Sequence, residues 1–311
     1  MLDFSVIIPV YQGEKTLEKL VSKLIEYFSS TNYRYEFIFV YDCGLDNSWE
    51  VLVKEKNKYP DLIKLVKLSR NFGQHNAIIC GFEYAEGDFI VTMDEDLQHL
   101  PVDIEKLIKE QQRGDFDVVY GKYDELKHSL FRNTTSEIFR KMLKKGVPDL
   151  YEHYSAFRLI KNEIAKATIE MQNSYTFVDG YLSWVTNSNS HVIVNHRERE
   201  EGGSSYSLRK LIEHSINIFV TFSNYPIRLL SKFSILLFLI SFLYAIFVIV
   251  NKLIYDNYIV GYATYIIIAG MGISFILLAL GILGEYIYRI NLKTTKRPNY
   301  KVREYHVTAK S

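Results

Sequence analysis

Residues 68–101 read LSRNFGQHNAIICGFEYAEGDFIVTMDEDLQHLP, and this stretch decides the fold. A helical pattern from about His75 to Ala85 is followed by the short apolar run DFIVTM, which has the length and composition of a buried strand. Three acidic residues, at positions 94–96, come directly after that run. Because adjacent carboxylates repel one another, the stretch is either a solvated turn before the helix opened by Pro101 or a cation site.

The same alternation of strand and helix patterns extends in both directions along the chain. Apolar and β-branched runs predict strands, and apolar residues at helical spacing predict helices between them. Strands alternating with helices indicate an α/β fold with a mainly parallel sheet that is covered on both faces. The predicted strands span residues 4–10, 35–41, 63–69, 88–93 and 115–121, and the predicted helices span 15–28, 47–58, 75–85 and 101–114.

Acidic residues follow two of these strands at the point where each ends. Asp42 and Asp46 follow YEFIFVY, and the acidic stretch at 94–96 follows DFIVTM. In parallel sheets, ligands bind beyond the carboxyl ends of the strands, so both groups are expected on one rim. If Met93 to Gln98 is extended, Asp94, Asp96 and Gln98 point one way and Glu95 points the other. Their oxygen atoms are ligands of the kind that Mg²⁺ or Mn²⁺ takes.

Two uncharged runs near the C-terminal end predict a membrane hairpin. Residues 233–250 and 261–284 are 18 and 24 residues long, and a spanning helix needs roughly 17 to 25. The alternative is a pair of buried helices in a soluble core. Basic residues flank the pair on the outside, which places both outer flanks in the cytoplasm. These are Arg228, Lys232, Arg289, Lys293, Lys296 and Arg297.

The N-terminal sequence, the cysteine count and the net charge argue against a secreted, a disulfide-stabilised or a nucleic-acid-binding protein. The opening MLDFSVIIPV has no basic region and no cleavage site, so it predicts a strand rather than a secretion signal. Two cysteines are too few for a disulfide framework and are consistent with a reducing compartment. A net charge of +1 gives no indication of nucleic-acid binding.

Several motifs, in order, resemble those of the membrane-anchored family-2 glycosyltransferases that act on polyprenyl phosphates. The group includes dolichol-phosphate mannose synthases and bacterial undecaprenyl-phosphate sugar transferases. The matching segments are FSVIIPVY, VYDCGLD, the stretch at 68–101, RNTTSEIFRKML, and REREEGGSSY followed by LRKLI. The resemblance covers nearly the whole chain. It implies a GT-A type domain that binds a UDP- or GDP-sugar, a divalent metal, and a polyprenyl phosphate acceptor, with inversion at the sugar.

The resemblance also assigns roles to particular residues. Asp94, Asp96 and Gln98 match the metal motif, and Asp96 and Arg132 are the predicted catalytic residues. Arg132 and Ser136 match a pair associated with the acceptor phosphate, although Arg132 alone would also fit a solvated helix. The predicted donor-binding residues are Pro9, Tyr11, Glu14, Asp42 and Asp94, together with Arg199, Ser204 and Tyr206 in a loop that also contains Gly202.

This sequence departs from the family pattern at several places. The family usually reads Asp-Asp-Gly-Ser where this chain has Tyr41, Asp42, Cys43 and Gly44. Ser205 replaces a common lysine, and Ala156 replaces a common acidic residue. These differences affect the prediction of the nucleotide, the sugar and the acceptor.

The residue types suit the chemistry that the resemblance implies. Loss of a nucleoside diphosphate from the anomeric carbon leaves negative charge, which a divalent ion stabilises. A lipid phosphate is already anionic near neutral pH, so it needs positioning rather than a strong base. The planar guanidinium of Arg132 can pair with phosphate oxygens. A flexible loop containing Arg199 could close over the donor and limit hydrolysis.

Three functions are alternatives to sugar transfer onto a polyprenyl phosphate. A processive polysaccharide synthase would carry a Gln-x-x-Arg-Trp motif and more than two spans. A catalytically weak or silent nucleotide-sugar-binding scaffold would explain the altered segment at 41–44, as would transfer to a different membrane acceptor. A nicotinamide-dependent enzyme would need Gly-x-Gly-x-x-Gly after the first strand, where this chain has PVYQGEKT.

The sequence therefore predicts four regions in a multi-pass protein of the plasma membrane whose catalytic domain and termini are cytoplasmic. Glycines at 270, 272, 281 and 284 would allow close helix packing, either within the hairpin or between the protomers of a homo-oligomer, and the oligomeric state stays open. The regions are a catalytic domain at 1–206, an amphipathic interfacial segment at 207–230, two membrane helices within 231–288, and a basic tail at 289–311.

Overall fold

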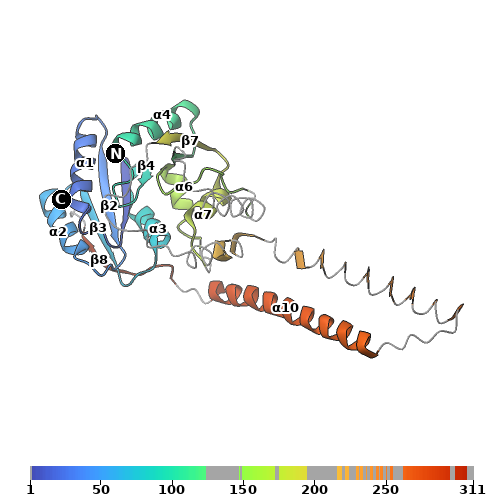
Figure 1. The fold of residues 1–311 in the computed structure, drawn as a ribbon. Helices are drawn as coiled ribbons and strands as arrows, with labels where there is room; N and C mark the ends of the chain where they lie inside the picture. The colour runs from blue at the N-terminus through green and yellow to red at the C-terminus, as the bar shows by residue number, and fades with distance from the viewer. Residues whose placement is uncertain are drawn as a thin grey trace.

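The computed structural model describes residues 2–123, 147, 149–171, 175–194, 216–218, 221–223, scattered positions in 229–254, 262–294 and 298–306. The N-terminal region is an α/β domain, and a long helix extends away from it (Figure 1).

One sheet of eight strands forms the centre of the domain, in the order β7-β5-β6-β4-β1-β2-β3-β8. Strands β1 to β4 pair in parallel, as the sequence predicts, whereas β6 and β8 run antiparallel to their neighbours. The sheet is therefore mainly parallel but mixed. The strands are β1 (Leu2–Val10), β2 (Tyr35–Tyr41), β3 (Ile63–Leu68), β4 (Gly87–Thr92), β5 (Val118–Tyr123), β6 (Arg158–Lys161), β7 (Asn189–Val194) and β8 (Val302–His306).

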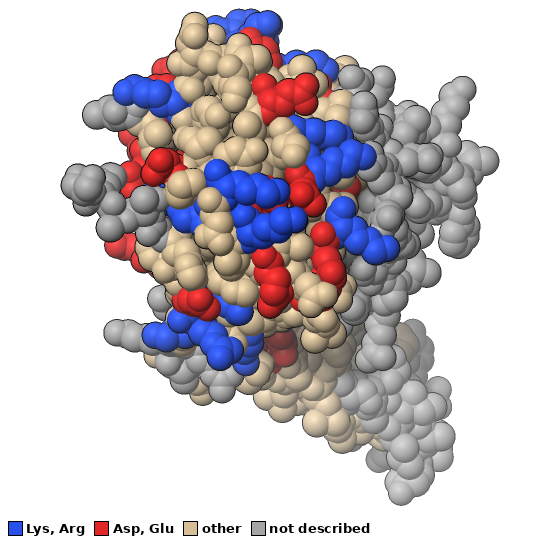
Figure 2. Space-filling model, turned by 90° about the vertical axis from the view of Figure 1, so that its left-hand side faces the viewer, with Lys and Arg blue, Asp and Glu red and all other residues tan. Residues whose placement is uncertain are grey.

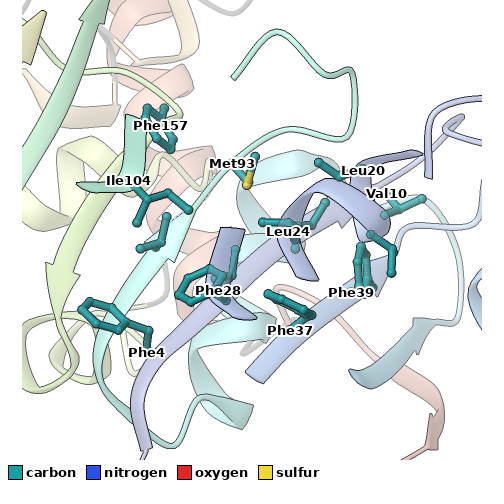
Figure 3. Packing of buried hydrophobic residues seen from close by; sticks show 14 of the residues in the cluster. Phe4, Val10, Leu20, Leu24, Phe28, Phe37, Phe39, Met93, Ile104 and Phe157 are labelled. Carbon is teal, nitrogen blue, oxygen red and sulfur yellow. The ribbon is translucent and has the colours of Figure 1, made fainter. Parts of the chain in front are cut away.

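Helices cover both faces of the sheet, because alternate side chains of each central strand point to opposite sides. One core lies between the sheet and α1 (Leu17–Ser29), α2 (Ser48–Lys58) and α4 (Ile104–Gly114), the last of which follows a short 3₁₀ turn, η1 (Pro101–Asp103). Figure 3 shows Leu20, Leu24 and Phe28 of α1 packed over Phe37 and Phe39 of β2. The other core packs against α3 (Gln74–Tyr84), α6 (Asn162–Ala167) and α7 (Val178–Val185).

The outer surface of the first helical layer carries mixed charge. Figure 2 shows Lys and Arg side chains interspersed with Asp and Glu on the face where α1 and α2 lie. Glu18 of α1 pairs there with Lys54 and Lys58 of α2, at N–O distances of 3.8 and 3.2 Å. Exposed pairs of this kind each contribute at most about 1 kcal/mol, so the fold depends mainly on the two apolar cores.

Two sequence predictions need correction. The extended conformation expected for Met93 to Gln98 is wrong, because residues 95–97 form a turn in which Leu97 has a φ of 62°. The basic tail predicted at 289–311 is not simply a tail, because α10 (Tyr262–Thr294) reaches into it and Val302–His306 form β8 against β3. The C-terminal region thus forms one edge strand of the sheet.

Helix α10 leads away from the domain and exposes many apolar side chains. Within the part of the chain that the structure describes, no helix combines the length and apolar character needed to cross a membrane. Among the side chains of α10 that the structure describes, the large apolar residues that are exposed include Tyr265, Ile268, Ile273, Ile276, Leu277, Leu278, Leu280, Leu283, Ile287, Tyr288 and Ile290.

Candidate active site

The candidate site lies at the rim formed by the carboxyl ends of β1, β2 and β4. Strand pairing sets this geometry, because Val10 pairs with Tyr41 and Ile7 pairs with Thr92. The residues that follow these positions therefore emerge along one edge. Asp42 and the acidic turn beginning at Asp94 lie on that edge, as the sequence predicts from the topology of parallel sheets.

The loops after β1 and β2 are hydrogen-bonded to each other. The backbone N–H of Gly13 donates to Ser48 Oγ at 2.9 Å, and the N–H of Glu14 donates to Asp46 Oδ2 at 3.0 Å. The Glu14 carboxylate in turn accepts hydrogen bonds from the backbone N–H and the side-chain amide of Asn47, at 3.1 and 2.9 Å. These contacts hold both loops in one arrangement. The predicted donor-binding role of Glu14 stays a prediction, and its observed contacts support the loops.

The backbone of Tyr11 lies so close to position 44 that only glycine fits there. A Cβ atom at this position would lie 1.5 Å from the carbonyl oxygen of Tyr11, so no other residue fits without moving the loop. Tyr11 itself is 38% exposed at the mouth of the site. The glycine therefore allows the loop after β2 to pass directly behind Tyr11.

Asp42 joins the β2 end to the start of α3. Its two carboxylate oxygens accept hydrogen bonds from the backbone N–H groups of Phe72 and Gly73, each at 2.7 Å. The side chain is only 3% exposed. Burial raises the pKa of Asp42 to about 6, although the two N–H groups act in the opposite direction. The enclosed carboxylate thus connects the end of β2 to the start of α3.

The acidic turn after β4 is hydrogen-bonded both to α3 and to the loop after β1. Asp94 Oδ1 accepts a hydrogen bond from the side-chain amide of Gln74 at 2.5 Å, and Asp96 Oδ1 accepts one from the backbone N–H of Gln98 at 3.1 Å. Glu95 points to the β1 loop, where its Oε1 accepts from the N–H groups of Tyr11 and Gln12 at 3.2 and 3.3 Å. Burial raises the pKa of Glu95 to about 7, and the charges of Asp94 and Asp96 add to the shift.

The donor chemistry of this turn fits a hard divalent cation. Among the described residues, no group of three or more His, Cys, Asp or Glu side chains is arranged to hold a metal. The predicted set of Asp94, Asp96 and Gln98 contains two carboxylates and one amide, so it would depend on further oxygen ligands from water or substrate. That is the usual arrangement for Mg²⁺ at phosphate sites.

The structure brings one part of the predicted site together and leaves another part outside the described residues. Pro9 lies in β1 opposite Val40 of β2, next to the loop that contains Tyr11. The predicted residues on the rim are Pro9, Tyr11, Glu14, Asp42, Asp94, Asp96 and Gln98. Arg132, Ser136, Arg199, Gly202, Ser204, Ser205 and Tyr206 lie outside the residues that the structure describes.

Sequence reasoning missed a buried ion pair below the rim. Arg158 of β6 and Asp179 of α7 form a hydrogen-bonded pair with side chains only 1% and 4% exposed. Arg158 also donates from Nε to Thr92 Oγ1 at 3.1 Å, and Thr92 donates to the carbonyl oxygen of Ala156 at 2.6 Å. The signal available in the sequence was a single carboxylate in the apolar segment FVDGYLSWV. The pair therefore supports the strand end from which the acidic turn emerges.

Solved structures share this GT-A type α/β fold with its mainly parallel sheet. Glucosyl-3-phosphoglycerate synthase from Mycobacterium tuberculosis, in complex with Mn²⁺, UDP-glucose and phosphoglyceric acid, aligns with a TM-score of 0.53. The alignment covers 71% of this chain and 78% of that one at 17% identity. At this level of identity the comparison establishes the fold.

Sequence comparison then identifies the family. Residues 5–169 match Glycosyl transferase family 2. An uncharacterized glycosyltransferase of Bacillus subtilis, YkcC, is 33% identical over 97% of this chain and 94% of its own length. Undecaprenyl-phosphate 4-deoxy-4-formamido-L-arabinose transferases of Photorhabdus laumondii and Proteus mirabilis are 32% and 33% identical, each over 96% of this chain and 93% of their own. The chain belongs to glycosyl transferase family 2 and is a glycosyltransferase.

Proposed function

We propose that this protein transfers a single sugar from a nucleotide-sugar to a polyprenyl phosphate, with undecaprenyl phosphate as the acceptor, at the cytoplasmic face of the plasma membrane. The observation that carries the proposal is the similarity, along almost the whole chain, to transferases named for undecaprenyl phosphate. The match includes the C-terminal segments as well as the catalytic domain, so it extends beyond the features common to nucleotide-sugar enzymes.

The rim supplies the donor half of the proposed site. Asp42 accepts a hydrogen bond from the nucleoside, and Tyr11 lies beside the donor at the open side of the rim. Asp94, Asp96 and Gln98 hold the divalent ion, Mg²⁺ or Mn²⁺. When bound, the ion supplies positive charge that stabilises the departing diphosphate. Asp94 is already oriented by Gln74, and the turn is fixed by Glu95 at Tyr11 and Gln12, so the carboxylates need little rearrangement.

The acceptor half of the proposal rests on residues outside the described part of the chain. Arg132 and Ser136 orient the lipid phosphate, and Arg199, Ser204 and Tyr206 close over the donor. A phosphate oxygen attacks the anomeric carbon as the bond to the nucleoside diphosphate breaks, and the configuration of that carbon inverts. The phosphate is anionic near neutral pH, so positioning is the main requirement and no strong base is needed.

The proposed membrane anchor consists of the two uncharged segments at 233–250 and 261–284, with 207–230 at the interface. The exposed apolar side chains along α10 support this proposal, because soluble proteins rarely expose an apolar surface of such extent. Single-cysteine variants at position 256 in the connection and position 301 near β8, made in a background without Cys43 and Cys80, would test it in intact cells. Labelling of position 256 alone by an impermeant reagent fits the proposed topology, and labelling of position 301 contradicts it.

The activity can be tested with purified protein, undecaprenyl phosphate, Mg²⁺ or Mn²⁺, and a panel of nucleotide-sugars that includes UDP-4-deoxy-4-formamido-L-arabinose. Release of nucleoside diphosphate and formation of glycolipid are followed together. Glycolipid from one donor, lost in Asp96→Ala and on chelation of the metal, supports the proposal. Asp88→Ala is a matched control, because Asp88 is an exposed aspartate in β4 away from the acidic turn. Metal-dependent nucleotide binding without glycolipid from any donor would favour a scaffold.

A further inference from the structure

Near its C-terminal end, helix α10 is hydrogen-bonded to the segment at 216–223. The guanidinium group of Arg289 donates to Thr221 Oγ1 at 2.9 Å and to Asn217 Oδ1 at 3.2 Å. Its Nε also donates to Glu285 Oε1, one turn earlier, at 2.8 Å. The Arg289 side chain is only 15% exposed. In the next contact, Tyr286 donates its hydroxyl to the carbonyl oxygen of Ser223 at 3.1 Å.

The segment that receives Arg289 is packed on α7. Phe222, which is 8% exposed, lies with its ring centroid 4.8 Å from that of Trp184 and 5.8 Å from that of Phe177. Gly180 makes this approach possible, because a Cβ atom there would lie 2.5 Å from the Phe222 ring. The segment therefore has little freedom to shift over α7 without losing its packing.

Helix α7 leads directly to the catalytic rim by two routes. Asp179 pairs with Arg158, which is hydrogen-bonded to Thr92 two residues before Asp94. On the other route, the ring of Phe177 lies 5.3 Å from that of His75 in an edge-to-face contact. The residue before His75 is Gln74, whose side-chain amide is hydrogen-bonded to Asp94. The first route consists of buried side chains, whereas the second ends at the exposed side chain of Gln74.

We propose that Arg289 is a positioning residue that sets the height and tilt of the catalytic rim relative to the membrane helix, through Thr221, Asn217 and α7. This inference rests on the proposed function, because only an acceptor held in the membrane requires the rim at a fixed level. The planar guanidinium group of Arg289 donates to two side chains of the 216–223 segment and also to Glu285 of its own helix, and the single ammonium group of a lysine cannot reproduce this geometry. Its loss lowers the fraction of time for which the rim faces the lipid phosphate and leaves the donor site intact.

The test compares two acceptors with four variants. Undecaprenyl phosphate in vesicles requires correct positioning of the rim, whereas a short-chain polyprenyl phosphate dissolved in the same buffer does not. We expect Arg289→Ala to raise the KM for undecaprenyl phosphate at least tenfold. The KM for the donor and the kcat with the short acceptor are expected to change less than twofold. Arg289→Lys is expected to be intermediate, and Tyr286→Phe to show a smaller rise of the same kind.

Arg113→Ala is the matched control, since Arg113 is a 74% exposed arginine on α4 that pairs with Glu110 on its own helix. Equal losses with both acceptors in Arg289→Ala, or no rise in the KM for undecaprenyl phosphate, would overturn the positioning role.

Hydrogen exchange separates this inference from the proposed function. Arg289→Ala is expected to increase amide exchange in 216–223 and in α7, and Arg113→Ala is not. If amide exchange is unchanged in Arg289→Ala, Arg289 does not stabilise the packing of 216–223 on α7, and the inference is refuted whichever acceptor the enzyme uses. If the wild-type protein forms no glycolipid from either acceptor, the proposed function fails, and the positioning of a lipid acceptor fails with it.

Discussion

Removal of one partner of the buried pair between Arg158 and Asp179 should strongly destabilise the domain. The two side chains are 1% and 4% exposed, so Asp179→Ala leaves a guanidinium charge with neither its counter-ion nor water. Breaking a buried pair in this way costs about 3–5 kcal/mol. For a domain of roughly 200 residues, each kcal/mol shifts the thermal midpoint by about 2–4 °C, so a decrease of about 6–20 °C is expected.

Thermal unfolding of the detergent-solubilised protein, followed by tryptophan fluorescence, would measure this decrease, because Trp184 lies in α7 together with Asp179. Asp61→Ala, at an exposed aspartate in the loop after α2, is the control and should shift the midpoint by no more than about 1 °C. The double variant Arg158→Met/Asp179→Leu should recover most of the loss, since an apolar pair needs no counter-charge. If Asp179→Ala matches Asp61→Ala, or if the double variant is as unstable as the single one, the reasoning is refuted.

Three further perturbations test other parts of the rim and sheet. Because burial raises the pKa of Asp42 from 3.8 to about 6, the folded protein holds this proton more tightly than the unfolded chain does. The stability that this carboxyl contributes is therefore present below pH 4 and is lost, up to about 3 kcal/mol, as the pH rises through 6. In Asp42→Asn, the thermal midpoint should therefore depend less on pH between pH 5 and 7 than it does in the wild-type protein. Gly44→Ala, whose Cβ would meet the carbonyl oxygen of Tyr11, should weaken nucleotide binding at least tenfold in calorimetry. Gly281→Ala, whose Cβ would meet nothing within 4 Å, is the control and should not weaken it. Deletion of residues 298–311 should expose the edge of β3 and lower the thermal midpoint by several degrees, whereas deletion of 307–311 alone should not.

The sequence predicts the first half of the fold well because its signals are local. Strands β1 to β4 and the helices between them have clear periodicity, and the parallel order follows from their alternation. Strands β6 and β8 were missed because RLIK and VREYH are short and contain charged residues. Their antiparallel pairing joins residues far apart in the chain, and β8 pairs with β3 across more than 230 residues of sequence.

For the candidate site, too, the features set by local sequence could be predicted and those set by tertiary contacts could not. Its location followed from the strand ends, but the conformation of the acidic turn did not. Leu97 has a left-handed backbone conformation that the two-residue periodicity of a strand does not anticipate. The role of Glu95 and the partner of Asp179 both depend on side chains brought together by tertiary packing, and no spacing rule in the sequence indicates either contact.

The unusual segment at 41–44 is held in place by contacts of its own. Tyr41 donates its hydroxyl to the carbonyl oxygen of Gly44 at 2.8 Å, and Cys43 donates its thiol to the carbonyl oxygen of Leu68 at 3.0 Å. The ammonium group of Lys67 lies 5.7 Å from the centre of the Tyr41 ring. These interactions hold the segment in place in a chain that lacks the first carboxylate and the serine of the usual motif.

The consequence for function concerns Asp42, which lies between two substituted residues. Its carboxylate still accepts both N–H groups at the start of α3, and this connects the β2 end to the helix that orients Asp94 through Gln74. Burial raises the pKa of this carboxyl, and the hydrogen bonds from Phe72 and Gly73 offset part of the cost of burying its charge. Asp42 therefore keeps the end of β2 joined to the start of α3, although residues on both sides of it differ from the usual motif.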